Sequence, residues 1–286
     1  MKRRQLFKTT LAGSAAAICG ESLVASAEAN TTFDGILDSN ISLFRWPFRR
    51  LPLDETKNLV EKLRSLGVTE AWAGSFEGAF HRDLASANVR LAGECGSYSE
   101  LSPIGTVDPL EPGWKRDFDA CVSNLKMPGI RLFPNRHGYS LDHPMFVRLL
   151  SLAAEAGVLV QLAVTLEDVR TQSEEIVSPD VDLEPLPEAM GKAPDAKVQL
   201  LNLRPRISQL TTLAEVPGLF FDTARADGTD GVASLLENTA PERVIFGSNA
   251  PFLIPEAAQI RVHEAALDPD PLLSVLRGNA SKLMKF

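Results

Sequence analysis

Three arginines that end or follow short apolar runs predict a pocket for an anion. Arg131 ends the run "GIR", while Arg204 and Arg225 come shortly after the runs "VQLL" and "GLFF". A guanidinium group presents several N–H donors in one plane, which suits two-point binding of a carboxylate. The alternative is that each arginine pairs with an acid inside the protein, such as Asp222 or Glu77, and both interpretations remain open.

Two residues beside these runs are suited to proton transfer. His137 lies in "PNRHGYS", where Gly138 and the polar neighbours predict a flexible loop over the pocket. A histidine in such a loop suits a general base near neutral pH, although a solvated loop histidine is the simpler interpretation. Asp222 ends the run "GLFF", and burial there would raise the pKa of its carboxyl group unless an arginine pairs with it. We therefore take His137 and Asp222 as the catalytic candidates.

Polar side chains at the ends of other apolar runs complete the candidate site. Most of them are amides, which donate and accept hydrogen bonds without carrying a charge. A tryptophan in "FRWPF" can supply a flat apolar wall, although packing is its more common role. The candidate substrate-binding residues beyond the three arginines are Asn40, Gln161, Asn202, Asn249, Glu77 and Trp46.

The elements that position these residues alternate between short β-rich runs and amphipathic stretches. Eight apolar runs are nearly unbroken, as expected of parallel strands that are covered on both faces. Eight βα units in about 250 residues predict a single (β/α)8 TIM barrel, whose chemistry lies at the carboxyl ends of its strands. A doubly wound open sheet is the alternative, but no glycine-rich turn follows the first run. The expected strands are residues 35–42, 68–75, 101–108, 129–134, 158–164, 197–203, 218–224 and 243–249.

Two of the expected helices have clear boundaries in the sequence. Residues 53–67 show the apolar spacing of a helix, with Asp54 as the expected N-cap. Residues 143–157 repeat this design and end at Gly157. The acidic, proline-rich stretch 171–196 is expected to be a loop with one short helix at the barrel mouth.

The first 29 residues have the features of an export signal. Arg3 and Arg4 precede a soft apolar run, and small residues of the A-x-A type follow at 25–29. The paired arginines before "QLFK" are typical of a twin-arginine signal, and the run is too short and too polar to span a membrane. We expect residues 1–29 to be removed and residues 30–286 to fold as one domain in the periplasm.

Composition restricts the partners of this chain. Its 286 residues carry a formal net charge of -8, with a pI near 5.2, which argues against nucleic acid as a partner. Cys95 and Cys121 remain after the signal, and whether they form a disulfide is left open, as is a homo-oligomer. The expected partner is a small anionic molecule.

The whole chain after the signal resembles the amidohydrolase-related (amidohydrolase 2) family of metal-dependent hydrolases. "ILDSNIS" matches the family's opening I-D-x-H-x-H strand and "RVIFGSNAPF" its closing L-F-G-S-D-x-P-F, with weaker matches at "GIRLFP" and residues 143–164. The resemblance implies one or two divalent metals such as zinc, held by histidines and by the final aspartate. The residues at these ligand positions are Asn40, Ser42, Gln161, Asn202 or a neighbour of it, and Asn249.

These neutral side chains are weak donors for zinc, which prefers imidazole, thiolate or carboxylate. The chain has four histidines, and too few of them stand near strand ends to rebuild such a centre. We therefore expect no metal and no other cofactor. Two functions follow as hypotheses. One is a metal-independent hydrolase of a small carboxylated ester, lactone or amide, and the other is a catalytically inactive barrel that binds a small anionic ligand.

Overall fold

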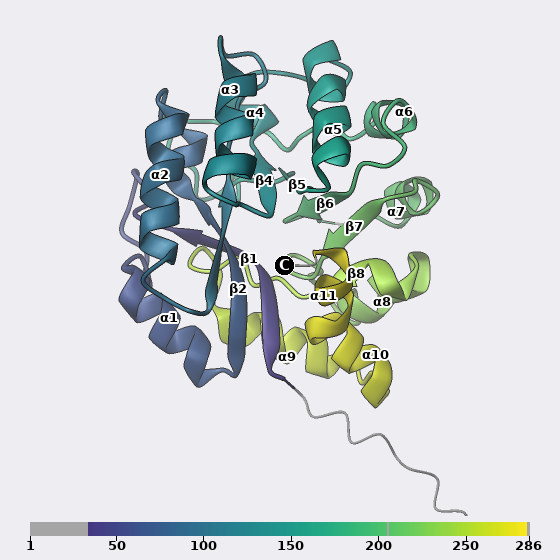
Figure 1. Ribbon diagram of the computed structural model, residues 1–286. Helices are drawn as coiled ribbons and strands as arrows, with labels where there is room; N and C mark the ends of the chain where they lie inside the picture. The colour runs from purple at the N-terminus through teal and green to yellow at the C-terminus, as the bar shows by residue number, and fades with distance from the viewer. Residues whose placement is uncertain (1–33, 205, 285–286) are drawn as a thin grey trace, which may run out of the picture. The chain divides into compact units, whose positions relative to one another are not determined.

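Eight parallel strands form one sheet, in which the strands pair in chain order (Figure 1). The computed structural model describes residues 34–204 and 206–284. Each pairing from β1–β2 to β7–β8 is parallel, which confirms the predicted (β/α)8 TIM barrel. The strands are β1 Ile36–Leu43, β2 Val68–Ser75, β3 Leu101–Gly105, β4 Gly129–Leu132, β5 Leu159–Ala163, β6 Val198–Leu201, β7 Leu219–Asp222 and β8 Val244–Ile245.

The segment after the short strand β8 brings the two ends of the sheet together. The backbone N–H of Ser39 on β1 donates to the carbonyl oxygen of Phe246 at 3.0 Å. Further along, the N–H of Asn249 donates to the carbonyl oxygen of Asn40 at 2.8 Å. Parallel pairing therefore continues beyond β8 as far as Ala250, which bridges to Ile41. The closing run "IFGSNA" thus lies against the polar end of β1.

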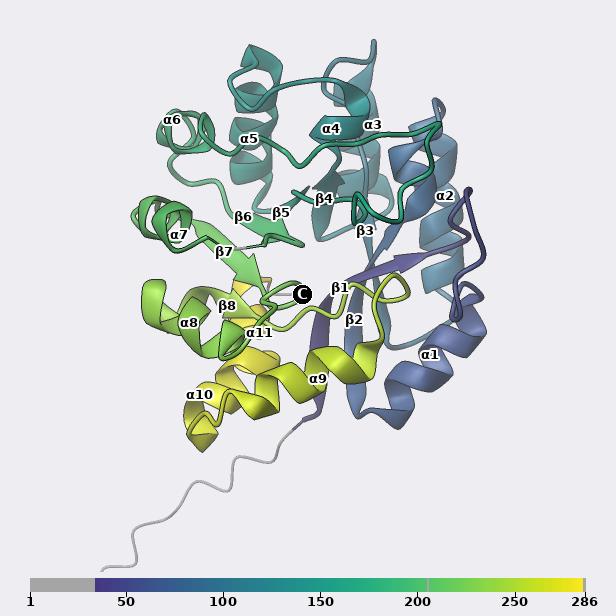
Figure 2. The ribbon, with the colours of Figure 1, turned by 180° about the vertical axis from the view of Figure 1, so that it is seen from behind.

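Helices cover the outside of the sheet on every side (Figures 1 and 2). A 3₁₀ turn, η1 (Phe76–Ala79), directly follows β2. The predicted loop 171–196 does contain one short helix, α6. The helices are α1 Thr56–Ser65, α2 Leu84–Cys95, α3 Trp114–Asp119, α4 Pro134–His137, α5 Pro144–Ala156, α6 Leu186–Gly191, α7 Ile207–Ala214, α8 Gly231–Asn238, α9 Pro255–Glu264, α10 Pro269–Leu273 and α11 Asn279–Leu283.

Helix α5 shows how the sequence pattern produces this packing. Its buried residues Phe146, Leu149, Leu150 and Ala153 follow the i, i+3, i+4, i+7 spacing of one helix face. Each large apolar side chain buried in this way contributes about 1.5–3 kcal/mol to folding. The helix ends at Gly157, whose φ of +69° is left-handed and suits glycine, as predicted.

The expected cap of α1 is wrong by one residue. Glu55 rather than Asp54 precedes the first helical residue, and neither side chain caps the helix. The carboxylate of Asp54 instead accepts from Arg50 Nη2 at 2.9 Å and from the N–H of Leu51 at 3.3 Å. The guanidinium of Arg50, four residues earlier, therefore binds the Asp54 carboxylate that the sequence predicts as the cap of α1.

The inside of the barrel is layered because alternate residues of a strand share a face. Five strand residues and α11 form an apolar cluster deep in the barrel: Leu37, Trp72, Ile104, Leu159, Ile245, Ala280 and Leu283. Two residues further along β1 and β5, the inward face becomes polar at Ser39 and Gln161. An aromatic cluster then covers the carboxyl ends of the strands.

Three expectations concern the chain as a whole. The proposed signal, residues 1–29, lies outside the described residues. Within the part of the chain that the structure describes, no helix is long and apolar enough to cross a membrane. Cys95 and Cys121 are both buried free thiols, and burial raises the pKa of each to about 12.

Candidate functional site

A network of buried amides and a hydroxyl links three strands across the barrel. Gln161 donates through Nε2 to the carbonyl oxygen of Ser39 and to Oε1 of Gln199, both at 2.8 Å. Gln199 donates to Ser39 Oγ at 2.7 Å, and that hydroxyl donates to the carbonyl oxygen of Phe246 at 2.7 Å. These bonds offset the desolvation of the buried groups. Ser39 and Gln199 are absent from the sequence prediction, although a lone polar residue inside an apolar run is the signal that points to them.

Arg131 on β4 brings a positive charge into this network. The residue is 2% exposed. Its Nε donates to Gln161 Oε1 at 2.9 Å, and its Nη1 donates to the carbonyl oxygen of Ile41 at 3.0 Å and to Ser42 Oγ at 3.1 Å. Burial lowers the pKa of Arg131 to about 10, against the attraction of Asp222 and Asp38. The guanidinium therefore stays charged at neutral pH.

Asp222 at the end of β7 is held by amide donors. Its Oδ2 accepts from Asn40 Nδ2 at 2.7 Å, and its Oδ1 accepts from the backbone N–H of Asn202 at 3.0 Å. Burial raises the pKa of Asp222 to about 7 in spite of these bonds. The same Asn40 amide donates to Asn202 Oδ1 at 2.9 Å, so one asparagine holds two of the predicted site residues. The structure thus brings Asn40, Asn202 and Asp222 together.

Asp38 on β1 is a second buried acid. Its Oδ1 accepts from the backbone N–H groups of Asn40 at 3.1 Å and Ser248 at 2.9 Å. Its Oδ2 has no hydrogen-bond partner. Burial raises the pKa of Asp38 to about 6. Asp38 stands at the polar tip of the opening "ILDSNIS" run, but it is not among the catalytic or substrate-binding residues named from the sequence.

A small cavity lies where these polar groups meet the carboxyl ends of the strands. Its volume is about 10 Å³, which is close to the space that one water molecule needs. Arg131 and Asn249 both line it, and both are buried. Nη2 of Arg131 and Nδ2 of Asn249 have no hydrogen-bond acceptor. Two unsatisfied N–H donors therefore belong to the wall of one cavity.

Aromatic side chains close this cavity from the barrel mouth. Phe76, Phe133 and Phe252 line it. Trp46 is buried among the same side chains and packs edge-on against Phe252 with ring centroids 4.7 Å apart and against Phe76 at 5.3 Å. Trp46 does not line the cavity, so the proposed flat wall consists of phenylalanines that the tryptophan supports.

The model of the amidohydrolase family matches residues 47–286. The chain belongs to the amidohydrolase family. No curated protein matches the chain at a significant level.

Solved structures with the same fold include two decarboxylases and a protein named amidohydrolase 2. 5-Carboxyvanillate decarboxylase from Sphingomonas paucimobilis aligns with a TM-score of 0.67 and 15% identity over 87% of this chain and 98% of that one. A dihydroxybenzoic acid decarboxylase from a Polaromonas species, solved with manganese and 2-nitroresorcinol, gives 0.64 and 12% over 86% and 96%. Amidohydrolase 2 from Bifidobacterium longum subsp. infantis gives 0.60 and 16% over 87% and 97%.

His137 lies apart from the cavity of this amidohydrolase-family barrel. It is the last residue of helix α4, so the predicted flexible loop is wrong, and Gly138 ends the helix with a φ of +77°. The Nε2 atom of His137 is 3.0 Å from the carbonyl oxygen of Gly78, and burial lowers the pKa of the imidazole. His137 does not line the cavity. The side chain instead fixes η1 against α4.

Arg204 and Arg225 do not join Arg131. Both lie beside Asp168 in the segment that follows β5: Arg204 forms an ion pair with it, and Nη1 of Arg225 is 4.0 Å from Asp168 Oδ2. The guanidiniums of Arg170 and Arg204 hold the pKa of Asp168 below its usual range. Arg131 points inward from strand β4. Arg204 and Arg225 instead follow β6 and β7, and their side chains lie beside Asp168 at the rim of the barrel. The single three-arginine pocket is therefore not formed.

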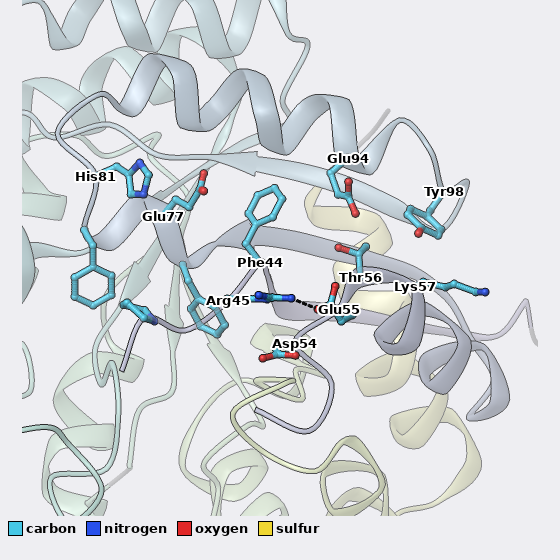
Figure 3. Close-up of a pocket in the computed structure, with 13 residues that line it drawn as sticks. Phe44, Arg45, Asp54, Glu55, Thr56, Lys57, Glu77, His81, Glu94 and Tyr98 are labelled. Atoms are coloured by element: carbon cyan, nitrogen blue, oxygen red, sulfur yellow. Dashed lines mark hydrogen bonds and ion pairs between the residues drawn. The ribbon is translucent and has the colours of Figure 1, made fainter. Parts of the chain in front are cut away.

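Glu77 lies in a separate cleft between α1, η1 and α2 (Figure 3). Its Oε2 accepts from Arg90 Nη2 at 2.7 Å, and the same Nη2 is 3.3 Å from His81 Nδ1. The cleft has a volume of about 530 Å³. Phe76 lines both this cleft and the buried cavity, so one aromatic side chain forms part of the wall of each.

Proposed function

We propose that this amidohydrolase-family barrel binds a small carboxylate in its central cavity without a metal ion and does not transform it. The observation that carries the proposal is the pair of buried donors, Arg131 Nη2 and Asn249 Nδ2, that lack acceptors beside one cavity. A carboxylate supplies two oxygens that only accept, and one of its partners would be a guanidinium. The cavity therefore suits the end of an anionic ligand.

The residues at the family's metal-ligand positions do not fit a divalent cation. Asn40 directs its Nδ2 donor group at Asp222 and Asn202, and Gln161 uses both ends of its amide within the protein. Among the described residues, no group of three His, Cys, Asp or Glu side chains is arranged to hold a metal ion. The guanidinium of Arg131 would also repel a second cation at this place. No step of the proposed function passes through a metal.

The surroundings of the cavity favour a planar ring behind the carboxylate. Phe76, Phe133 and Phe252 line the side away from the polar network, and such faces stack well on an aromatic ring. The space of about 10 Å³ requires some of these rings to move when a ligand enters. Phe76 also lines the neighbouring cleft, so a movement of this ring would open the cavity toward that cleft. The decarboxylases of similar structure are named for carboxylated aromatic compounds, which supports an aromatic carboxylate as the ligand.

The chemistry of the lining favours binding over catalysis. Ser42 is the one hydroxyl residue in the lining, and it accepts a hydrogen bond from Arg131. Asn40, Asn202 and Asn249 neither gain nor lose protons at neutral pH. Asp222 does not line the cavity and is separated from it by Asn40.

One observation favours the second candidate, metal-independent hydrolysis of a small carboxylated ester, lactone or amide. The pKa of Asp222 is raised to about 7, which suits a general base at neutral pH, and Asn40 connects its carboxylate to the cavity. Turnover of such compounds that persists with a chelator and is lost in Asp222→Asn would establish this candidate. Absence of turnover in a protein that binds carboxylates supports the first.

Asn249→Asp tests the binding site. Asp has the size of Asn and tolerates the positive φ of 55° at this position, but it replaces the free donor by an acceptor. We expect the Kd for benzoate or 2,6-dihydroxybenzoate, measured by calorimetry, to rise roughly 10- to 100-fold. Asn124→Asp, the same change on the surface, should leave the Kd unchanged. The proposal fails if wild-type protein ignores both acids at millimolar concentration or binds neutral benzamide equally well.

A further inference from the structure

The guanidinium of Arg131 engages two of the residues that stand at the family's ligand positions. Ser42 occupies the second histidine position of the opening strand, and its Oγ accepts from Nη1 at 3.1 Å. Gln161 occupies the position of the fifth-strand histidine, and its Oε1 accepts from Nε at 2.9 Å. These oxygens carry the lone pairs that a metal would have to use. The arginine therefore binds the atoms that a metal would bind.

The neighbouring strand leaves room for this cation. Gly74 on β2 faces the guanidinium, and a Cβ atom built on it would lie 2.5 Å from Arg131 Nη1 and 2.6 Å from Cζ. Such a contact is far shorter than van der Waals contact. Because the guanidinium is fixed by three hydrogen bonds, it cannot move aside without losing them. A residue larger than glycine at this place would displace the charge.

Buried acids supply the opposite charge. Asp38 and Asp222 are both buried, and both attract Arg131. A buried charge without a partner is strongly destabilising, so Arg131 stabilises the ionised form of either acid. Each acid loses its proton only above its raised pKa, about 6 for Asp38 and about 7 for Asp222. The three charged groups come from β1, β4 and β7. The hydrogen bonds of Arg131 itself join β4 to β1 and β5.

We infer that the Arg131 guanidinium is the built-in central cation of this barrel and takes the place and the structural role of a metal ion. It binds the side chains at two ligand positions and attracts the buried acids Asp38 and Asp222. This inference does not require that a carboxylate ligand binds. It explains why Ser42 and Gln161 both give their side-chain oxygens to a guanidinium of the same chain.

Chemical rescue tests the inference. Arg131→Ala leaves a space for a guanidinium ion, and we expect it to lower Tm by roughly 10 °C. Guanidinium chloride at 20 mM should then raise the Tm of Arg131→Ala by several degrees, whereas 20 mM urea, which is neutral and of similar shape, and 20 mM sodium chloride should not. Arg116→Ala, which removes a guanidinium from an exposed ion pair, should show no such rescue. Equal responses to urea and guanidinium, or none to either, would overturn the inference.

A second comparison covers the case in which Arg131→Ala does not fold. Arg131→Lys keeps the charge and Arg131→Met keeps the approximate volume without it, so the lysine variant should have the higher Tm. A methionine variant that is as stable as the lysine variant would show that no cation is needed. Wild-type protein should show the same Tm with 1 mM manganese chloride, 1 mM zinc chloride or EDTA. Saturable stabilisation of the wild type by either metal would also overturn the inference. Neither assay depends on carboxylate binding, so the two proposals fail separately.

Discussion

The amide side chains of Asn40 and Gln161 each form a hydrogen bond with one buried charged group, Asp222 and Arg131 respectively. Sequence position reveals such residues, because each follows or interrupts an apolar run at the end of a strand. Their partners are not visible in the same way. Asn40 meets Asp222 across 182 residues of chain, and which oxygen accepts from which nitrogen depends on the packing of the whole barrel. The same limit explains why Arg131 was expected to join the other two arginines.

Substitution of the buried acid Asp222 should change how stability depends on pH. The pKa of this group is raised from 3.8 to about 7, so between these values the folded protein holds a proton that the unfolded chain has lost. Stability is then highest at low pH and falls as pH rises toward 7. Ionisation of Asp222 alone should lower the free energy of unfolding by roughly 2–3 kcal/mol between pH 5 and pH 8. Asp222→Asn abolishes this titration, and urea unfolding at the two pH values should show a flatter dependence.

Asp38 provides the internal comparison for this experiment. Its pKa is raised to about 6 by burial, so it contributes a smaller loss of stability over the same interval, with the same sign. Asp38→Asn should therefore flatten the pH dependence less than Asp222→Asn does. An unchanged slope in Asp222→Asn would mean that the carboxyl group of Asp222 titrates normally in the folded state.

Strands and helices were predictable because their patterns are local. Seven of the eight strands fall within the expected runs and β1 extends one residue past its run, to Leu43. Nearly unbroken apolar residues are required wherever helices cover one face of a parallel strand and the barrel core covers the other. Errors occur at ends. Asp54 pairs with Arg50 and does not cap α1. The segment around His137 folds into α4 because Pro134 starts a helical turn there. Competing contacts of single side chains decide such boundaries.

Alanine substitutions at two glycines with positive φ distinguish the cost of backbone strain from the cost of a steric clash. Gly218 precedes β7 with a φ of +73°, and a Cβ atom there would lie 2.3 Å from the carbonyl oxygen of Ala196. Gly157 has a φ of +69° at the end of α5, and a Cβ atom there would meet nothing within 4 Å. Gly157→Ala should cost about 1–2 kcal/mol, and Gly218→Ala roughly 1–3 kcal/mol more.

The free energy of unfolding in urea, at a pH where both variants fold, measures this difference. Gly157→Ala is the control, because it carries the same conformational strain without the contact. Equal losses in the two variants would show that the β6–β7 edge can shift to accept a methyl group.

At the scale of the molecule, the barrel stacks three environments along its axis: an apolar cluster with α11, a polar network with one arginine and two acids, and an aromatic cover at the mouth. The sequence predicts the eight βα units, but it does not predict this order of environments along the barrel axis. It depends on how far each strand is staggered against its neighbours, which sets the residues that share a level. Trp46 and Phe252 meet only because the closing segment returns to β1.

Residues 1–29 lead to a prediction about export of the full-length chain in a bacterial host. If residues 1–29 are a twin-arginine signal, Arg3→Lys combined with Arg4→Lys should leave most of the protein inside the cell, because the export receptor reads the arginine pair rather than its charge. The double substitution preserves the positive charge and so serves as its own electrostatic control. Fractionation should place the wild-type barrel in the periplasm, and the mass of that protein should correspond to cleavage after Ala27 or Ala29. Equal export of both proteins, or a periplasmic protein that retains the first 29 residues, would show that this segment is not such a signal.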